Sequence, residues 1–191
     1  LRADLNRSEP NVVNELTRWM REMAEFVRHG EGHVVEVIGT VQDITDRHAA
    51  QESIRLLSQA MDQSSSDIVI TDCDGYIIYI NPRCIESTGY TRDELLLQNP
   101  CLVQSGNTPM SVYQNLWETI TSGQTWRGEL QNRKKDGTLF WEYAVISPVR
   151  DGNGTITHYL AIKDDITAQK RLEEERQQAL AKAEQASRAK S

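Results

Sequence analysis

The sequence predicts an α+β fold in which a five-stranded antiparallel sheet has short helices covering one face, with a polar helix on either side of the domain. Apolar strand patterns occur between residues 64 and 167 as a pair and then as a group of three, with helical patterns in the interval between them. Sequences rich in Asp, Asn and Gly separate neighbouring strands, as the tight turns of antiparallel hairpins require. Polar helical patterns precede this region at residues 46–63 and follow it at residues 168–191.

The first two strands are expected at residues 67–71 and 76–80. Both runs are apolar, and the sequence Asp-Cys-Asp-Gly at residues 72–75 suits the turn of a hairpin. Asn-Pro opens a short helix at residues 81–87, because Pro is favoured at the first helical position. The sequence Thr-Arg-Asp-Glu at residues 91–94 is a capping box and predicts the start of a second short helix.

The longest inserted helix is expected at residues 108–122. Thr108 is its predicted N-cap, Pro109 its first helical residue and Gly123 its stop signal. Its apolar positions recur at helical spacing, and they are Met110, Tyr113, Leu116, Trp117 and Ile120. We expect this apolar face to be buried against the sheet.

Three further strands are expected at residues 125–133, 138–149 and 155–165. Lys-Asp-Gly at residues 135–137 and Asp-Gly-Asn-Gly at residues 151–154 mark the two turns between them. A sheet with this order of elements has one open face that the longest helix can cover, which leaves space for a pocket between helix and sheet.

Part of this pattern occurs a second time near the N-terminus. Asp-Ile-Thr at residues 43–45 returns at residues 165–167, an offset of 165 − 43 = 122, and the same offset aligns Trp19 with Trp141. Both copies share a Trp-led strand, a Gly-x-Gly turn and a second apolar strand. We therefore interpret the N-terminal segment as the last three strands of a truncated sister domain.

Several short motifs together resemble a PAS domain with its PAC half. In chain order they are Asn81-Pro82, Thr88-Gly89-Tyr90, Trp126-Arg127-Gly128-Glu129, Asn132-Arg133-Lys134-Lys135-Asp136-Gly137 and Asp165-Ile166-Thr167. The resemblance implies the PAS fold and covers nearly all of residues 64–167. It implies four segments: a PAC part of a truncated PAS domain at 1–45, a linker helix at 46–63, a complete PAS/PAC domain at 64–167, and a signalling helix that starts a coiled coil at 168–191.

Composition and charge exclude several classes of function. The net charge of −7, from 21 Lys and Arg against 28 Asp and Glu, disfavours nucleic acid as a partner. No apolar run approaches the roughly 20 residues that cross a bilayer, so we expect no direct membrane contact. Three cysteines without a C-x-x-C pair fit neither zinc nor a disulfide framework, and indicate a cytoplasmic setting without a bound metal. The chain begins without methionine, and we expect it to be a piece of a longer protein.

The last residues resemble the helix that enters the phosphoacceptor bundle of sensor histidine kinases, although some diguanylate cyclases carry similar linkers. The resemblance implies a cytoplasmic sensory PAS module that binds a small ligand or flavin and signals through residues 168–191 to a kinase output in the parent chain. Alternatives are a dimerisation or spacer module without cofactor, and an input domain of a diguanylate cyclase. We expect a homodimer through the flanking helices. The fragment itself has no phosphate loop and no nucleophile beside a base, so we expect it not to be an enzyme, with catalytic parts of the parent beyond residue 191.

The pocket is expected to hold FAD, a small metabolite or nothing. Similarity to the flavin-binding redox PAS domains of the nitrogen-fixation regulator type implies that Trp117 packs against the isoalloxazine and that Asn132 bonds the ring edge. Gln131, Tyr113 and Val69 complete the predicted site. The plainer interpretations are a core tryptophan and a turn asparagine.

Two other cofactor chemistries are disfavoured. None of the four histidines lies on the helix at residues 108–122, where haem-binding PAS domains place their axial ligand, so we expect no haem. Light-sensing relatives attach flavin to a cysteine that directly follows an asparagine, whereas here Pro100 separates Asn99 from Cys101. We therefore expect Cys101 to be a small core residue.

Overall fold

The computed structural model describes residues 10–13, 16–28 and 34–188, which form two compact units within residues 1–59 and 60–191. The first unit is a three-stranded antiparallel meander in the order β1-β2-β3. Its strands are β1 (Pro10–Val13), β2 (Leu16–Arg28) and β3 (Val34–Asp43), and the helix α1 (Thr45–Asp62) follows them. The Gly-x-Gly turn predicted between its last two strands lies outside the described residues.

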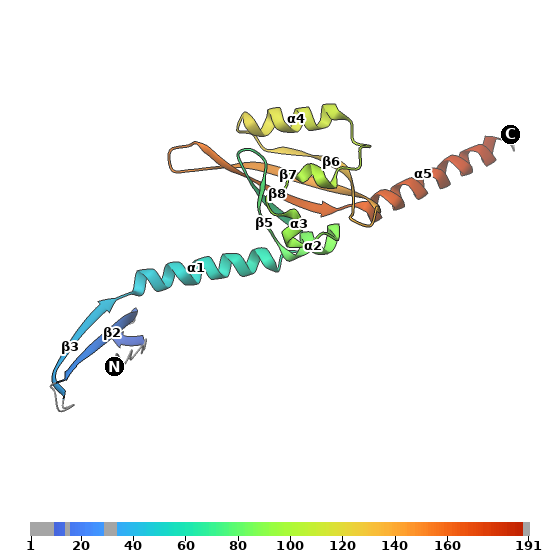
Figure 1. The fold of residues 1–191 in the computed structure, drawn as a ribbon. Helices are drawn as coiled ribbons and strands as arrows, with labels where there is room; N and C mark the ends of the chain where they lie inside the picture. The colour runs from blue at the N-terminus through green and yellow to red at the C-terminus, as the bar shows by residue number, and fades with distance from the viewer. Residues whose placement is uncertain (1–9, 14–15, 29–33, 189–191) are drawn as a thin grey trace. The chain divides into compact units, whose positions relative to one another are not determined.

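The second unit is built on a five-stranded antiparallel sheet in the order β5-β4-β8-β7-β6 (Figure 1). Its strands are β4 (Asp67–Asp72), β5 (Ile77–Ile80), β6 (Trp126–Arg133), β7 (Leu139–Arg150) and β8 (Ile156–Asp165). The inserted helices are α2 (Pro82–Thr88), α3 (Arg92–Leu95), the 3₁₀ helix η1 (Pro100–Val103) and α4 (Met110–Thr121), and α5 (Thr167–Arg188) follows the last strand. The predicted α+β class, with a five-stranded antiparallel sheet and several helices, is confirmed.

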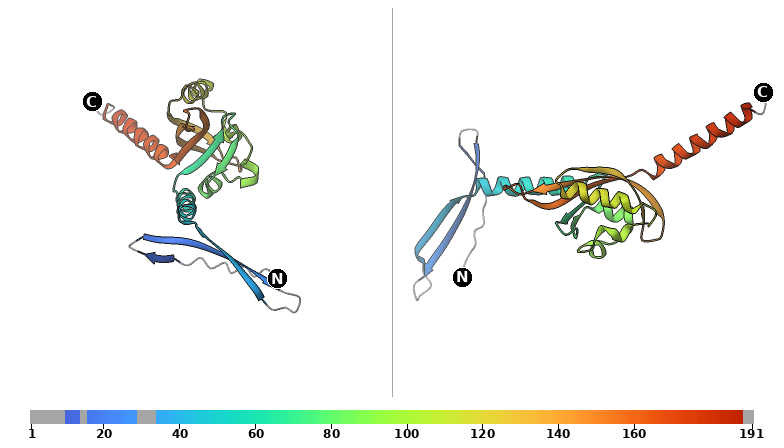
Figure 2. Two further views of the ribbon diagram at one scale, coloured as in Figure 1. Left: turned by 90° about the vertical axis from the view of Figure 1, so that its left-hand side faces the viewer. Right: turned by 90° about the horizontal axis from the view of Figure 1, so that it is seen from above.

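The inserted helices lie on one face of this sheet, as the views in Figure 1 and Figure 2 agree. Side chains alternate along each strand, so every second residue points toward the helices. The core beneath them combines Val69, Leu130, Ala144 and Ala161 from the sheet with Cys84, Leu95, Leu116 and Ile120 from the helices. This inner face of the sheet carries the candidate site.

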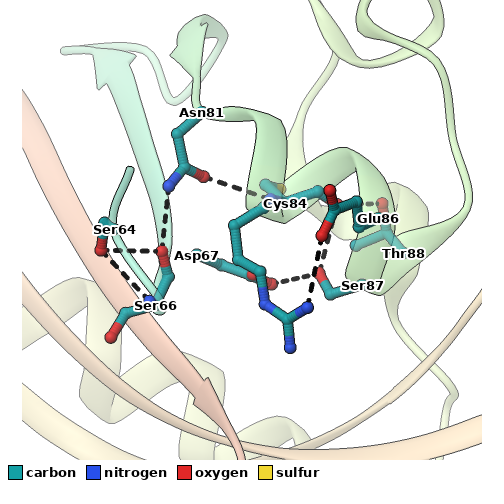
Figure 3. Close-up of polar contacts among 9 residues, drawn as sticks. Ser64, Ser66, Asp67, Asn81, Cys84, Glu86, Ser87 and Thr88 are labelled. Carbon is teal, nitrogen blue, oxygen red and sulfur yellow. Dashed lines mark hydrogen bonds and ion pairs between the residues drawn. The ribbon is translucent and has the colours of Figure 1, made fainter. Parts of the chain in front are cut away.

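Asn81 joins the start of α2 to β4 and to the segment before β4, and its side chain is fully buried. Its carboxamide oxygen accepts the backbone N–H of Ile68 at 3.0 Å and that of Cys84 at 3.1 Å. Its amide nitrogen donates to the carbonyls of Met61 at 3.1 Å and Ser66 at 3.0 Å. Figure 3 shows this side chain beside the first turn of α2. All four hydrogen bonds that an amide side chain can make are therefore formed.

Helix α4 differs from the predicted helix in its start and in its buried face. The helix begins at Met110 with Pro109 as its cap, because the Thr108 hydroxyl accepts the backbone N–H of Gln131 at 2.9 Å instead. Of the predicted apolar face, Leu116 and Ile120 are buried, but Met110 is 70% exposed and Trp117 is 38% exposed. The expectation that Trp117 is buried is wrong. Only a narrow stripe of α4 packs against the sheet, and Trp117 lies at the edge of that stripe.

The two units end in the same strand-to-helix junction. In the first, the backbone N–H of Trp19 donates to the Thr45 hydroxyl at 2.9 Å. In the second, the N–H of Trp141 donates to the Thr167 hydroxyl, also at 2.9 Å. The repeat seen in the sequence is thus also a repeat of hydrogen bonds. No helix in the described part of the chain has the length and apolar character that crossing a bilayer would need.

Candidate functional site

A cavity of about 90 Å³ lies between α4 and the inner face of the sheet. Most of its wall is apolar, formed by Val69, Val103, Leu116, Ile120, Leu130, Ile146 and Ala161. Its polar lining includes Thr71, Gln104, Tyr113, Asn132, Glu142 and Lys163. An apolar pocket with a few convergent polar groups is the usual form of a small-molecule site.

An ion pair between Lys163 and Glu142 forms one side of the cavity. Lys163 on β8 places Nζ 3.0 Å from Oε1 of Glu142 on β7, and their side chains are 12% and 3% exposed. Asp67 lies directly opposite Lys163 across the β4–β8 ladder and is also buried. Burial opposes the charge on Lys163, but the adjacent Glu142 carboxylate, with Cys84 and Asp67, raises the pKa of the ammonium above its ordinary value.

A second buried polar contact joins Asp67 to Ser87 on α2. The Ser87 hydroxyl donates to the Asp67 carboxylate, as Figure 3 shows. Burial raises the pKa of Asp67, and the Ser87 hydrogen bond opposes that rise. Burial also raises the pKa of the neighbouring Cys84 thiol to about 12. This thiol therefore stays protonated and is a poor nucleophile near neutral pH.

Two polar side chains of the lining, besides the ion-paired Glu142, have groups to offer a bound molecule. The Tyr113 hydroxyl is buried without a hydrogen bond. Asn132 is 2% exposed, yet its carboxamide makes no hydrogen bond to the described chain, in contrast to Asn81. Leaving a buried donor or acceptor unpaired costs about 1–3 kcal/mol, so both groups are suited to a bound molecule.

The Trp117 indole lines the cavity on its solvent side and is 38% exposed. The ring meets Tyr159 edge-on at 6.1 Å between centroids. On the other side it lies against Gly75 in the β4–β5 turn, where a Cβ atom would come within 2.9 Å of Trp117 Cη2. Asn99, Pro100 and Cys101 line the same region. Trp117 therefore lies on the solvent side of the lining, together with these partly exposed residues.

Four of the five predicted site residues come together at this cavity: Val69, Tyr113, Trp117 and Asn132. Gln131 does not line it, because adjacent strand residues point to opposite faces and its side-chain oxygen accepts from Asn107 Nδ2 at 2.7 Å. The expectation that Cys101 is a core residue is wrong, since its side chain is exposed.

The ion pair was missed by sequence reasoning, although a signal for it exists. Glu142 precedes the inward-facing Ala144 and Ile146 by two and four positions on β7. Lys163 similarly follows the inward-facing Tyr159 and Ala161 on β8. Period-two alternation places both charged residues on the inner face of the sheet. An opposite charge on the neighbouring strand stabilises each of them there.

The lining fits a flavin ring in kind. The apolar walls suit its two planar faces, and the Tyr113 hydroxyl and the Asn132 carboxamide suit its polar edge. Among the described residues, no group of three or more His, Cys, Asp or Glu side chains could hold a metal ion.

The comparisons with known proteins agree on one family. A family model described as PAS domain matches residues 65–168. The nitrogen fixation regulatory protein of Klebsiella oxytoca is 40% identical over 124 residues, which cover 65% of this chain and 25% of that protein. Blue-light-activated histidine kinase 1 of Erythrobacter litoralis is 28% identical over 127 residues, covering 65% of this chain and 35% of that protein. A solved structure described as "Flavin Analogue Sheds Light on Light-Oxygen-Voltage Domain Mechanism" has a TM-score of 0.55 and 26% identity, over 64% of this chain and 96% of that one. The chain thus spans about a quarter of the length of the regulator that it matches.

Proposed function

This chain belongs to the PAS domain family, the sensory domains of signalling proteins, and we propose that it is a cytoplasmic sensor that binds a flavin or another small molecule. The observation that carries this proposal is the cavity beneath α4, which is lined by the unpaired hydroxyl of Tyr113 and by the buried carboxamide of Asn132. A pocket that served only as packed core would satisfy such groups internally. The three cysteines, none in a disulfide, support the cytoplasmic location.

FAD is the cofactor we propose first, because relatives include a nitrogen fixation regulatory protein and a light-oxygen-voltage domain studied with a flavin analogue. A bound flavin would supply reversible redox chemistry. Of this chain's own residues, Trp117 would cover the ring and Asn132 would hydrogen-bond its polar edge. Trp117 already contacts solvent, so it can turn outward to admit a ring larger than the closed cavity.

The output in this proposal is the helix α5. Its first turn is fixed to the sheet by the Trp141–Thr167 hydrogen bond and by Lys170, whose Nζ lies 2.6 Å from Glu129 Oε2 and 5.5 Å from the centre of the Trp141 ring. Glu129 and Trp141 belong to β6 and β7, the strands that also carry Asn132 and Glu142. A change at the cavity therefore has a short route to α5. We propose a histidine kinase as the output domain, as in the blue-light-activated relative, with a diguanylate cyclase as the alternative.

A second candidate function, dimerisation without a cofactor, is favoured by the flanking helices. Helix α1 has no buried residue and exposes Ile54, Leu56 and Leu57, and α5 exposes Leu172 and Leu180. Apolar side chains along otherwise polar helices favour helix pairing between two copies. We therefore propose a homodimer through these helices, with or without a ligand in the cavity.

The visible spectrum of the purified protein separates a sensor that uses flavin from a spacer module without cofactor. A sensor that uses flavin shows flavin absorbance as purified or after incubation with FAD and removal of the excess, and Asn132→Ala retains less of it. A spacer module shows no absorbance in either sample while its helical circular dichroism is intact.

A further inference from the structure

The end of α1 and the start of α5 are joined by side chains that do not line the cavity. Asn81 and Tyr79 hold the last turn of α1, and the hydroxyl of Ser66, which follows α1, contacts the strand that leads into α5. We infer that a displacement of the last turn of α1 is passed through Ser66 and Asp164 to α5, independently of any ligand. The output helix then responds to two inputs, the cavity and α1.

The last turn of α1 is fixed to the sheet and to α2 by hydrogen bonds. The fully buried Asn81 side chain donates to the Met61 carbonyl at 3.1 Å and to the Ser66 carbonyl at 3.0 Å, the second of which Figure 3 shows. The Tyr79 hydroxyl donates to Asp62 Oδ1 at 3.0 Å. Because the Asn81 oxygen also accepts backbone N–H groups of β4 and α2, one amide holds the end of α1, the segment after it and β4 in a fixed relation.

Ser66 connects this entry segment to the exit strand β8. Its hydroxyl donates to Asp164 Oδ1 at 2.6 Å, and Asp164 is the residue opposite Ser66 when the β4–β8 register is extended by one position. The carboxylate of the next residue, Asp165, accepts the backbone N–H of Thr167, the first residue of α5, at 2.9 Å. A hydrogen bond to a charged acceptor is stronger than one between neutral groups. Two consecutive residues of β8 therefore hold the entry segment and the exit helix.

This route and the cavity contact opposite faces of the same strand. Lys163 lines the cavity, whereas Asp164, the next residue along β8, points to the other face of the sheet. A ligand in the cavity and a displacement of α1 can therefore both act on the end of β8 without competing for the same side chains.

The test is a double-mutant cycle on the full chain without added ligand, measured by amide hydrogen exchange. Ala60→Gly weakens the last turn of α1 at an exposed position. It should raise the exchange rates of the Ile166 and Lys170 amides by about threefold or more, because glycine lowers helix stability and the loosened turn no longer holds the route. In the Ser66→Ala background, Ala60→Gly should leave these two rates unchanged. Ser66→Ala keeps the backbone N–H of this residue bonded to Ser64 Oγ, so only the contact with β8 is lost.

Ser122→Ala is the matched control, because it removes one hydroxyl hydrogen bond from an exposed serine at the end of α4. In this background the response of the two amides to Ala60→Gly should be retained. The amide of the buried Ala144 on β7 reports global unfolding, and all rates are compared with it. A general loss of stability is thereby separated from coupling.

Two results overturn the inference and leave the proposed ligand binding untouched. One is unchanged exchange at the two amides after Ala60→Gly, and the other is a response of equal size in the Ser66→Ala background. If Ser66→Ala does not fold, Asp164→Ala removes the same hydrogen bond from the acceptor side, and the same two results decide.

Discussion

The Trp117 ring lies so close to Gly75 that a Cβ atom added to the glycine would come within 2.9 Å of Trp117 Cη2. The contact joins α4 to the β4–β5 turn across the mouth of the cavity. Gly75 also has φ +85°, a backbone conformation that side chains rarely adopt. Gly75 is therefore required both for the conformation of the β4–β5 turn and for the close contact with Trp117.

Gly75→Ala should lower the free energy of unfolding more than Gly154→Ala does. Gly154 has the same φ of +85° in the β7–β8 turn, but nothing lies within 4 Å of an added Cβ. Both variants lose about 1 kcal/mol to backbone strain, and Gly75→Ala loses about 1 kcal/mol more because Trp117 must move. Urea denaturation of the two variants gives the difference directly. Equal losses would mean that the Trp117 contact has no energetic weight.

Trp117→Ala should affect ligand binding more than stability. Because Trp117 is 38% exposed, its removal should cost about 1–2 kcal/mol, whereas removal of a core tryptophan costs about 3–5 kcal/mol. Leu116→Ala, one residue earlier on the buried stripe, should cost about 2–5 kcal/mol. The stability of each variant is measured by thermal unfolding. A larger loss of stability for Trp117→Ala than for Leu116→Ala would show that the indole packs as a core residue.

Replacing each of two buried asparagines by alanine should lower the free energy of unfolding by very different amounts. Asn81→Ala removes four hydrogen bonds and leaves backbone groups unpaired, so it should cost about 3 kcal/mol or more. Asn132→Ala removes no hydrogen bond to the described chain and should cost less than about 1.5 kcal/mol, yet it should weaken FAD binding. Denaturation and an FAD titration on each variant make the comparison. Equal stability losses would contradict the assignment of Asn132 to a ligand.

The Cys84 thiol should make the fold sensitive to alkali. Its folded pKa is about 12, against an ordinary value of 9.0, so between these values the unfolded chain releases this proton and the folded chain does not. Stability is fully present below pH 9 and is lost as the pH rises toward 12, at about 1.4 kcal/mol per pH unit. Cys84→Ala should reduce the slope of unfolding free energy against pH in this range, and Cys73→Ala, at an exposed thiol, should not. The same slope in both variants would show that Cys84 ionises freely in the folded protein.

The elements of the second unit could be predicted because its turns carry Asp and Gly at fixed places and its strands are apolar between them. The position of Trp117 could not, because helical periodicity gives the direction of an apolar stripe but not how much of that stripe the sheet covers. Gln131 and Asn132 were predicted as one group, yet successive strand residues face opposite sides, and only Asn132 reaches the cavity. The Glu142–Lys163 pair depends on the neighbouring register of β7 and β8, which is a long-range property that local patterns do not contain.

The most direct test of the account is a titration of the ¹⁵N-labelled chain with FAD, followed at the side-chain amide signals of its asparagines. The account predicts that the Asn132 signals shift in proportion to bound FAD while those of Asn153, in the exposed β7–β8 turn, stay in place. The central claim is that the cavity beneath α4 is the ligand site. FAD binding that shifts other asparagines and leaves Asn132 unchanged would contradict it.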